Sequence, residues 1–181
     1  MPHVCPSWLS FILYNPMRRK FTDRDKIVRD SMIGKDSTVL EVGAGNGFLT
    51  EAIAETARKI VIAELQEGMV KKLRKRVEKY GDKIEIITAD ISSARLETGF
   101  ADVCILYYCF HEISDQPAAV INISKSVKNE GILSIYEPTV EVGKKAMEET
   151  VNMFNNEGFI KEAENNGLFT RFVRMRKQSG N

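Results

Sequence analysis

A glutamate and three glycines follow a short apolar run, and their types and spacing could bind a ligand. Gly43, Gly45 and Gly47 permit positive φ angles and let the backbone come close to a bound molecule. Glu41 precedes the first glycine by two residues. A glycine-rich turn between a buried strand and a helix is typical of ligand loops at the carboxyl end of a parallel strand, where the first N–H groups of the helix also point. The alternative is a turn whose glycines serve only to pack the helix on the strand.

The spacing of the glycines indicates which ligand the loop could take. A dinucleotide fingerprint, Gly-x-Gly-x-x-Gly, would need its third glycine where Phe48 stands, so an oxidoreductase is the weakest alternative. The pattern Glu-x-Gly-x-Gly-x-Gly instead resembles motif I of the class I methyltransferases that depend on S-adenosylmethionine (SAM). SAM has no phosphate, so a carboxylate at the loop suits it better than it suits a pyrophosphate. The resemblance implies that Glu41 lies near the amino group of SAM. It also implies that the loop packs against the cofactor through Gly43, Ala44, Gly45 and Gly47.

Two further acids end the next apolar runs. Glu64 follows the run 59–63 at ~20 residues from the loop, where a carboxylate can accept from both hydroxyls of a ribose. Asp90 follows the run 84–88, and the resemblance implies that it accepts from the adenine amine while Ile91 packs on the ring. The same resemblance counts Leu65 and Tyr107 among the cofactor-binding residues. The alternatives are an exposed charge at a strand end for Glu64 and a turn residue for Asp90.

The segment after residues 101–107 should face the methyl group, because ligands sit beyond the carboxyl ends of parallel strands near the switch in strand order. His111 is the best candidate for a base, since histidine titrates near neutrality. Glu112, Tyr107 and Tyr108 could orient the molecule that accepts the methyl group, called the acceptor below. The alternative is a histidine that only hydrogen-bonds a loop. We predict His111, Glu112 and Tyr108 as the catalytic residues.

The class of acceptor can be narrowed, because the sequence lacks several motifs that are typical of particular methyltransferases. The residues after 101–107 contain no proline motif of the kind found in methyltransferases that act on amide or base nitrogens, and the chain has no Pro-Cys pair. The stretch 43–51 is similar to the rRNA adenine dimethylases, but their Asn-x-Pro-Tyr-type motif is missing. The run 110–113 is closer to the small-molecule branch, which includes quinone C-methylases. The resemblance therefore favours a small-molecule acceptor.

Alternating strand and helix patterns must position these residues. The predicted strands are 38–42, 59–63, 84–88, 101–107 and 132–137, and the predicted helices are 47–57, 67–80, 114–128 and 141–155. A hairpin of 158–164 and 168–176 around the turn 164–167 closes the chain. We expect an α/β fold, a Rossmann-like doubly wound sheet that is mostly parallel, and the resemblance implies the strand order 3-2-1-4-5-7-6. Residues 1–181 would form a single domain in which 1–33 are a helical cap or lid, or else a helix that covers the sheet.

Composition sets the remaining limits. Of 181 residues, 43% are hydrophobic and 28% charged, as in ordinary globular proteins, and the net charge of +1 gives no overall attraction to nucleic acid. Three cysteines without Cys-x-x-Cys spacing suit a reducing compartment, so we expect a cytoplasmic protein without a signal peptide or membrane span. No pattern demands a metal.

Other functions stay open at this point. Methylation of RNA is one alternative, favoured by the basic helix 67–80 and by Arg171, Arg174 and Arg176. A non-catalytic subunit that needs a partner chain is another alternative. A homodimer in which residues 7–20 close the neighbour's site would also fit.

Overall fold

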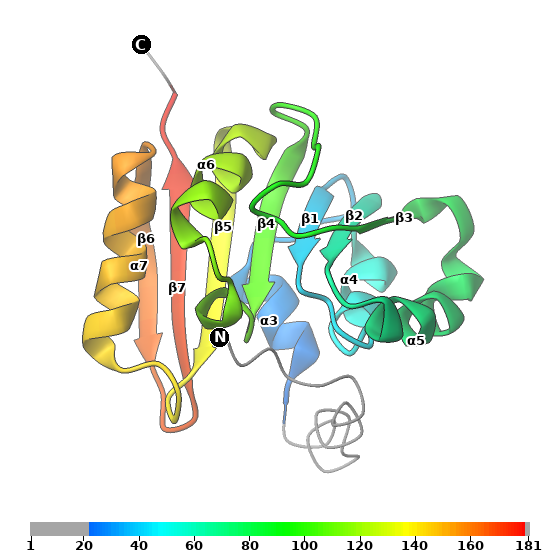
Figure 1. The fold of residues 1–181 in the computed structure, drawn as a ribbon, viewed down its shortest axis with the longest axis horizontal. Coiled ribbons are helices and arrows are strands. Elements are labelled where there is room, and N and C mark those ends of the chain that lie inside the picture. Colours follow the sequence, from blue (N-terminus) through cyan, green and yellow to red (C-terminus); the bar gives the residue numbers. More distant parts are fainter. Residues whose placement is uncertain (1–21, 180–181) are drawn as a thin grey trace.

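The computed structural model describes residues 22–179 and arranges them around one seven-stranded sheet with the order β3-β2-β1-β4-β5-β7-β6 (Figure 1). The strands are β1 (Thr38–Val42), β2 (Lys59–Glu64), β3 (Ile84–Thr88), β4 (Ala101–Tyr107), β5 (Val127–Pro138), β6 (Phe159–Asn166) and β7 (Thr170–Lys177). The helices are α3 (Arg24–Asp30), α4 (Thr50–Thr56), α5 (Glu67–Val77), α6 (Gln116–Ser126) and α7 (Lys144–Asn156), with 3-10 turns η2 (Glu78–Lys83) and η3 (Phe110–Glu112). The first five strands pair in parallel and β7 pairs antiparallel with β5 and β6. The predicted fold class and strand order are confirmed.

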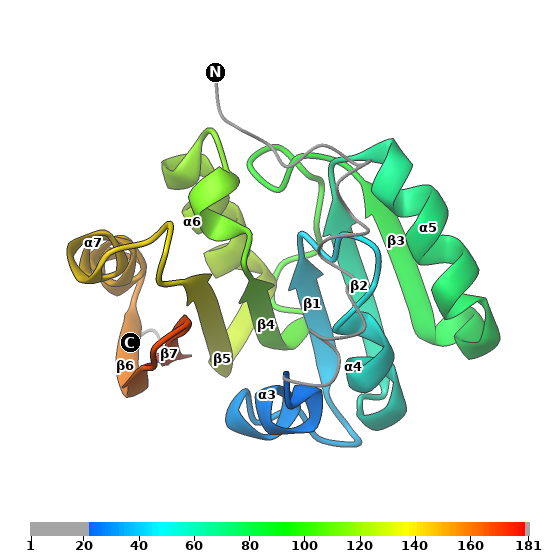
Figure 2. The ribbon, with the colours of Figure 1, turned by 90° about the horizontal axis from the view of Figure 1, so that it is seen from below.

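Helices cover both faces of the sheet and create two apolar layers. Helices α6 and α7 lie over one face, while α3, α4 and α5 lie over the other (Figure 2). Neighbouring residues of β1 alternate between the two layers: Leu40 belongs to the first and Val39 to the second, and both are fully buried. A strand that is buried on both faces reads as a continuous apolar run, which is why the sequence located the central strands.

Several element ends differ from the prediction. Helix α4 begins at Thr50 rather than at residue 47, because Gly43, Gly45 and Gly47 all have positive φ and prolong the turn. Helix α7 begins at Lys144 and α5 ends at Val77.

The largest difference is at residues 127–131, which the prediction placed partly in the helix 114–128 and otherwise before the strand 132–137, but which belong to β5. Val127 pairs with Ala101, and the register then shifts before Val103. Glu130 takes a φ of 62°, and Gly131 packs so closely that a Cβ atom would lie 3.2 Å from the carbonyl oxygen of Asp102. The strand therefore continues through an irregularity that periodicity does not reveal.

The closing hairpin is confirmed, although its turn lies further along the chain than predicted. β6 continues to Asn166, and the N–H of Gly167 donates to the carbonyl oxygen of Thr170 at 3.0 Å. The turn therefore consists of residues 167–169.

Only part of the predicted cap lies within the described residues. The predictions for residues 1–21, including a lid or a swapped segment at 7–20, fall outside that part of the structure. Helix α3 packs against α4 and buries Ile27 and Val28 in the second apolar layer, so this portion covers the sheet. Between residues 22 and 179, no helix is both long enough and apolar enough to cross a bilayer.

Candidate active site

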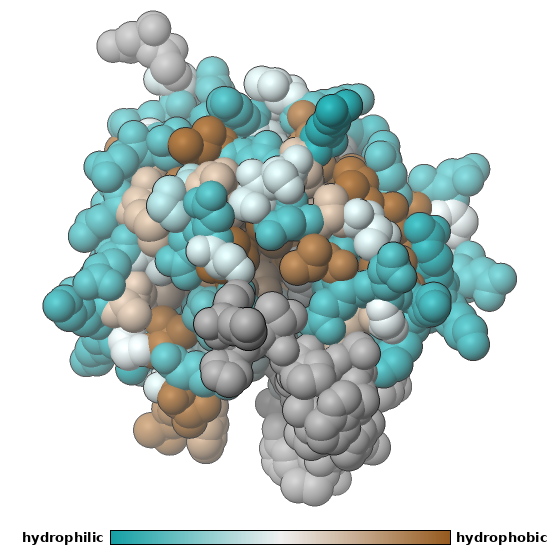
Figure 3. Space-filling model, viewed as in Figure 1, coloured by the Kyte–Doolittle hydropathy of each residue, from teal (hydrophilic) through white to brown (hydrophobic). Residues whose placement is uncertain are grey.

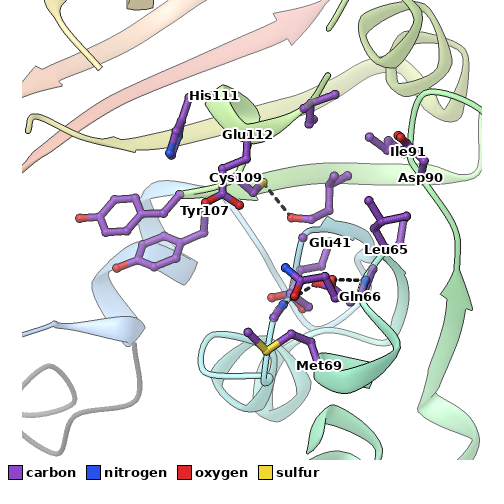
Figure 4. Close-up of a pocket in the computed structure, with 18 of the residues that line it drawn as sticks. Glu41, Leu65, Gln66, Met69, Asp90, Ile91, Tyr107, Cys109, His111 and Glu112 are labelled. Atoms are coloured by element: carbon purple, nitrogen blue, oxygen red, sulfur yellow. Dashed lines mark hydrogen bonds between the residues drawn. The ribbon is translucent and has the colours of Figure 1, made fainter. Parts of the chain in front are cut away.

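A cavity of about 330 Å³ opens where the carboxyl ends of β1, β2, β4 and β5 meet the loop after β3 (Figure 4). Twelve of the thirteen predicted site residues line it. They are Glu41, Gly43, Ala44, Gly45, Glu64, Leu65, Asp90, Ile91, Tyr107, Tyr108, His111 and Glu112. Figure 4 shows Asp90, Ile91 and Leu65 on one side and Tyr107 and His111 on the other, with Glu41 between them. The cavity therefore suits an elongated ligand.

Two of the glycines are required by close packing. At Gly43 φ is +65°, and an added Cβ would lie 2.6 Å from the Cβ of Cys109. The Sγ of Cys109 donates to the carbonyl oxygen of Val42 at 3.1 Å, so the turns after β1 and β4 are held together there. Gly47 does not line the cavity: its φ is +84°, and an added Cβ would lie 2.8 Å from Leu73 Cδ1 on α5. Gly47 therefore packs the loop against α5.

Glu41 is a buried carboxyl group whose Oε2 atom has no hydrogen-bond partner among the described residues. Only 2% of the residue is exposed. Burial raises the pKa of Glu41 to about 7; the Thr50 side chain opposes this shift, and the charge of Glu64 adds to it. A buried carboxyl oxygen without a donor is costly, so this atom is suited to receive a donor or cation from a ligand.

Glu64 is held at the cavity wall by backbone N–H groups. Its Oε2 accepts from the N–H of Gly45 and its Oε1 from the N–H of Gln66, both at 2.8 Å. Burial raises the pKa of Glu64, while these backbone donors oppose the shift. A carboxylate has about four lone-pair positions, so both oxygens can still accept from a ligand.

The loop after β3 presents Asp90 and Ile91. The N–H and hydroxyl of Ser92 donate to Asp90 Oδ1 at 2.9 and 2.8 Å. The amide of Asn122 on α6 donates to the carbonyl oxygen of Ile91 at 2.7 Å and to that of Ala94 at 2.8 Å. These contacts fix the loop and leave Asp90 Oδ2 available to a ligand.

His111 is bound by a glutamate that the sequence analysis missed. Glu137 Oε2 lies 2.5 Å from His111 Nδ1, and the N–H of His111 donates to Glu137 Oε1 at 3.2 Å. On the other side of the ring, Nε2 lies 2.5 Å from Glu141 Oε2, but these atoms are not directed for a hydrogen bond. The hydrogen bond to Glu137 raises the pKa of His111 against the effect of burial, and the charges of Glu137, Glu141 and Glu112 raise it further.

The position of Glu137 in the fold explains the pair. Glu137 lies near the end of β5, only 1% of it is exposed, and β5 is the neighbour of the strand that precedes His111. The rule that functional side chains gather at the carboxyl ends of parallel strands would have found it. The lining residues that the prediction missed are Val42, Asn46, Phe48, Leu49, Ala63, Gln66, Met69, Ala89, Cys109, Ile113, Ser114, Pro138 and Glu141.

Two stacked tyrosines form the wall next to His111. The rings of Tyr107 and Tyr108 lie 4.3 Å apart with an angle of 14° between their planes. Tyr108 has a φ of 58°, an uncommon value for a residue with a side chain. Its hydroxyl forms a hydrogen bond with the Thr170 hydroxyl on β7. Tyr108 lines the cavity, while its hydroxyl is engaged with the hairpin.

The basic residues that favoured RNA are divided between two environments. Lys71, Arg74 and Lys75 are exposed on α5. Arg174 and Arg176 instead form ion pairs with Glu162 within the hairpin. The hairpin arginines therefore stabilise β6 and β7. In the described part of the chain, no group of three or more His, Cys, Asp or Glu side chains could hold a metal ion.

Comparison with known families and sequences gives a consistent set of matches. A family model described as a methyltransferase domain matches residues 40–135, just over half of the chain. An uncharacterized methyltransferase of Geobacillus sp. (strain WCH70) is 28% identical over 144 residues, which are 78% of this chain and 66% of that protein. The mitochondrial ribosomal RNA small subunit methyltransferase of Arabidopsis thaliana is 48% identical, but over only 69 residues. These are 37% of this chain and 18% of that protein, so the likeness covers a small part of the relative.

Solved structures share the fold. A SAM-dependent methyltransferase from Aquifex aeolicus superposes with a TM-score of 0.83 at 20% identity, covering 96% of this chain and 99% of that one. The N-methyltransferase NodS from Bradyrhizobium japonicum, solved with S-adenosylhomocysteine (SAH), gives a TM-score of 0.75 at 17% identity. That alignment covers 91% of this chain and 89% of the other.

Proposed function

Because the chain belongs to the methyltransferase domain family, whose cofactor is SAM, we propose that it transfers the methyl group of SAM to a small-molecule acceptor bound beside His111. One observation carries this proposal: acids at the ends of three successive segments, Glu41, Glu64 and Asp90, line the same cavity as His111. A turn that served only packing would not need a buried, unpartnered carboxyl oxygen at Glu41.

Under this proposal, each polar group of the cofactor has a partner among the lining residues. Glu41 Oε2 would accept from the amino group of SAM, because it is buried without a donor. Glu64 would accept from the ribose hydroxyls, since backbone N–H groups already fix its orientation. Asp90 Oδ2 would accept from the adenine amine, and Ile91 would pack on the ring. When bound, SAM would supply a sulfonium methyl group, to which a nucleophile can bond in line as the carbon–sulfur bond breaks and SAH leaves.

His111 would act as the base for an acceptor that must lose a proton. Glu137 engages Nδ1, so Nε2 is the ring nitrogen left to receive that proton. Glu141 must move away from Nε2 before the acceptor reaches it, and Glu141 can do so because its side chain is 55% exposed. Because the pKa of His111 is raised, the neutral base becomes available only as the pH rises.

The acceptor end of the cavity supports a small molecule. Tyr107, Tyr108, Ile113 and Pro138 provide flat and apolar walls, as is common in small-molecule sites.

Isotope transfer would test the acceptor class. The protein would be incubated with methyl-labelled SAM, together with either a cell extract of molecules below about 1 kDa or ribosomal subunits. We expect label in the small-molecule fraction, lost in His111→Asn. Label that enters only RNA would overturn the small-molecule assignment and leave the cofactor assignment intact.

Methylation of RNA is the second candidate, favoured by the exposed lysines of α5 and by the short likeness to a ribosomal RNA methyltransferase. It predicts binding of RNA that weakens steeply with salt. Reversing the charge of Lys71 and Lys75 should then reduce the affinity for RNA, and it should also reduce the steepness with which that affinity falls as the salt concentration rises. A slope that does not change would remove this candidate.

A further inference from the structure

Three large apolar side chains stand out on the surface beside the cavity. Val140 is 85% exposed, Leu168 88% and Phe169 79%, whereas the other exposed large apolar residues of the described chain reach only 52%. Figure 3 shows an apolar projection at its lower left, where Figure 1 places the turn between β6 and β7. We call Val140, Leu168 and Phe169 the apolar rim.

Hydrogen bonds join the two loops that carry the apolar rim. The N–H of Thr139 donates to the carbonyl oxygen of Phe169 at 3.1 Å. The hydroxyl of Thr139 donates to the carbonyl oxygen of Leu168 at 2.7 Å. The guanidinium of Arg171 donates to the carbonyl oxygen of Val142 at 2.8 Å. The loop after β5 and the hairpin turn are thus held together as one projection.

The apolar rim borders the mouth of the cavity. Pro138 and Glu141, which flank the loop carrying Val140, both line the cavity. Thr170, next to Phe169, bonds the hydroxyl of Tyr108 in the cavity wall. Whatever covers the apolar rim is therefore brought to the entrance of the site.

The size and charge of this region favour a lipid surface over a protein partner. A stable protein interface buries about 800 Å² on each side and involves about 20–30 residues, far more than three projecting side chains offer. Insertion of a few apolar residues into the boundary between headgroups and acyl chains needs no matching surface. Lys144 and Lys145 begin α7 beside this loop and are exposed. Lys145 lies 3.9 Å from Glu149, but its side chain is 90% exposed and stays open to a headgroup, while the exposed Glu141 contacts His111 on the cavity side. Ammonium groups in this place suit anionic headgroups.

We propose that the apolar rim inserts into an anionic lipid surface while Lys144 and Lys145 contact the headgroups, so that the cavity receives an acceptor carried by the membrane. The lipid contact rests on the apolar rim and the two lysines, and only the delivery of an acceptor rests on the proposed function. This inference narrows the acceptor to a lipid-soluble small molecule.

Vesicle co-sedimentation of the full chain tests the contact directly. The vesicles would contain phosphatidylcholine alone or with about 30% phosphatidylglycerol. We expect binding to the mixed vesicles that weakens several-fold in 0.5 M NaCl. The double variant Leu168→Ser/Phe169→Ser should bind at least about tenfold more weakly, because two apolar side chains no longer enter the bilayer. The variant Lys144→Gln/Lys145→Gln should lose the preference for anionic vesicles.

A matched control uses Ile160→Ser, an apolar residue that is 50% exposed on β6 and lies outside the apolar rim. This variant should bind vesicles like the wild type. SAM affinity, measured separately by calorimetry, should be unchanged in all variants. Absence of vesicle binding by the wild type would overturn the proposal, as would equal binding by the rim variant. So would a wild-type dimer in sedimentation velocity that the rim variant abolishes. None of these outcomes depends on whether SAM binds.

Discussion

His111 depends on Glu137 for both its orientation and its charge. The Nδ1 contact of 2.5 Å to a glutamate that is 1% exposed is the main cause of the raised pKa of His111. Glu137→Gln keeps the shape of the side chain but removes its negative charge, so the pKa of His111 should fall toward 6.5, the ordinary value for histidine. If neutral His111 is the base, the rate should rise with pH, and the midpoint of that rise should move to lower pH in the variant.

Nuclear magnetic resonance can follow this change directly, because the chain contains only two histidines, His3 and His111. A ¹H–¹⁵N titration of the imidazole signals gives each pKa without any assay of activity. Glu148→Gln, an exposed change on α7, is the control and should leave both midpoints in place. An unchanged His111 midpoint in Glu137→Gln would show that the pair does not control this proton.

If Glu41 receives the amino group of SAM, both the stability of the fold and the binding of the cofactor should depend on pH. Burial raises its folded-state pKa to about 7 from 4.5, so the folded protein keeps a proton that the unfolded chain has already lost. The free energy of unfolding linked to Glu41 therefore falls as pH rises from 4.5 to about 7, and changes no further above that. The difference in the free energy of unfolding between Glu41→Gln and the wild type should therefore shift by about 3 kcal/mol in favour of the variant when the pH is raised from 4.5 to 8.

Urea unfolding of both proteins across this range would measure the difference. The same proton should appear in calorimetry, because a cationic amino group beside Glu41 lowers its pKa and releases the proton on binding near pH 7. Heats that do not vary with the ionisation enthalpy of the buffer would contradict the placement of the amino group at Glu41.

The individual residues differ in how far the sequence could locate them. Glu41, Glu64 and Asp90 each follow or lie within an apolar strand next to a turn, so their approach to one cavity follows from the parallel sheet. The contact of Cys109 with Gly43 could not be predicted, because it depends on packing between two loops 66 residues apart. Gly47 has the same residue type and spacing as Gly43 and Gly45 but packs on α5, and only the three-dimensional arrangement distinguishes these roles.

At the scale of elements, the turn after β1 and the turn after β4 are packed tightly together. Gly43→Ala would force a side chain into a φ of +65° and place its Cβ 2.6 Å from the Cβ of Cys109. We expect a loss of about 3 kcal/mol or more in the free energy of unfolding, and SAM binding should be lost with it. Gly99→Ala has nearly the same φ, +62°, but meets nothing within 4 Å, so it should cost only about 1 kcal/mol and keep SAM binding. Equal effects in the two variants would mean that close packing at Gly43 is unimportant.

The strands were easier to predict than the helix ends. Central strands carry continuous apolar runs because both faces are covered, and the sequence shows this directly. Helix starts depend on where a turn finishes, and the positive φ of Gly47 delays α4 to Thr50. Residues 127–131 contain Lys128, Asn129 and Glu130, whose polarity indicates a turn, yet the pairing of Val127 with Ala101 draws them into β5.

At the scale of the whole molecule, the cavity draws its walls from segments between residues 41 and 141, so a ligand there stabilises the whole sheet. SAM at about 100 times its Kd should add about 2.7 kcal/mol to the free energy of unfolding. For a domain of this size the melting temperature should rise by roughly 5–10 °C in thermal unfolding. His111→Asn should keep this rise, because His111 is assigned to the acceptor. A rise that disappears in His111→Asn would contradict the division of the cavity into cofactor and acceptor ends.

The central claim is that this cavity binds SAM, and isothermal titration calorimetry with SAM and SAH tests it most directly. We predict that both ligands bind the wild type with one site per chain. Binding should weaken about 30-fold or more in Glu64→Ala, since two charge-assisted hydrogen bonds to the ribose are lost. Glu67→Ala, an exposed glutamate at the start of α5, should bind like the wild type. Absence of binding by the wild type, or equal binding by Glu64→Ala, would contradict the account.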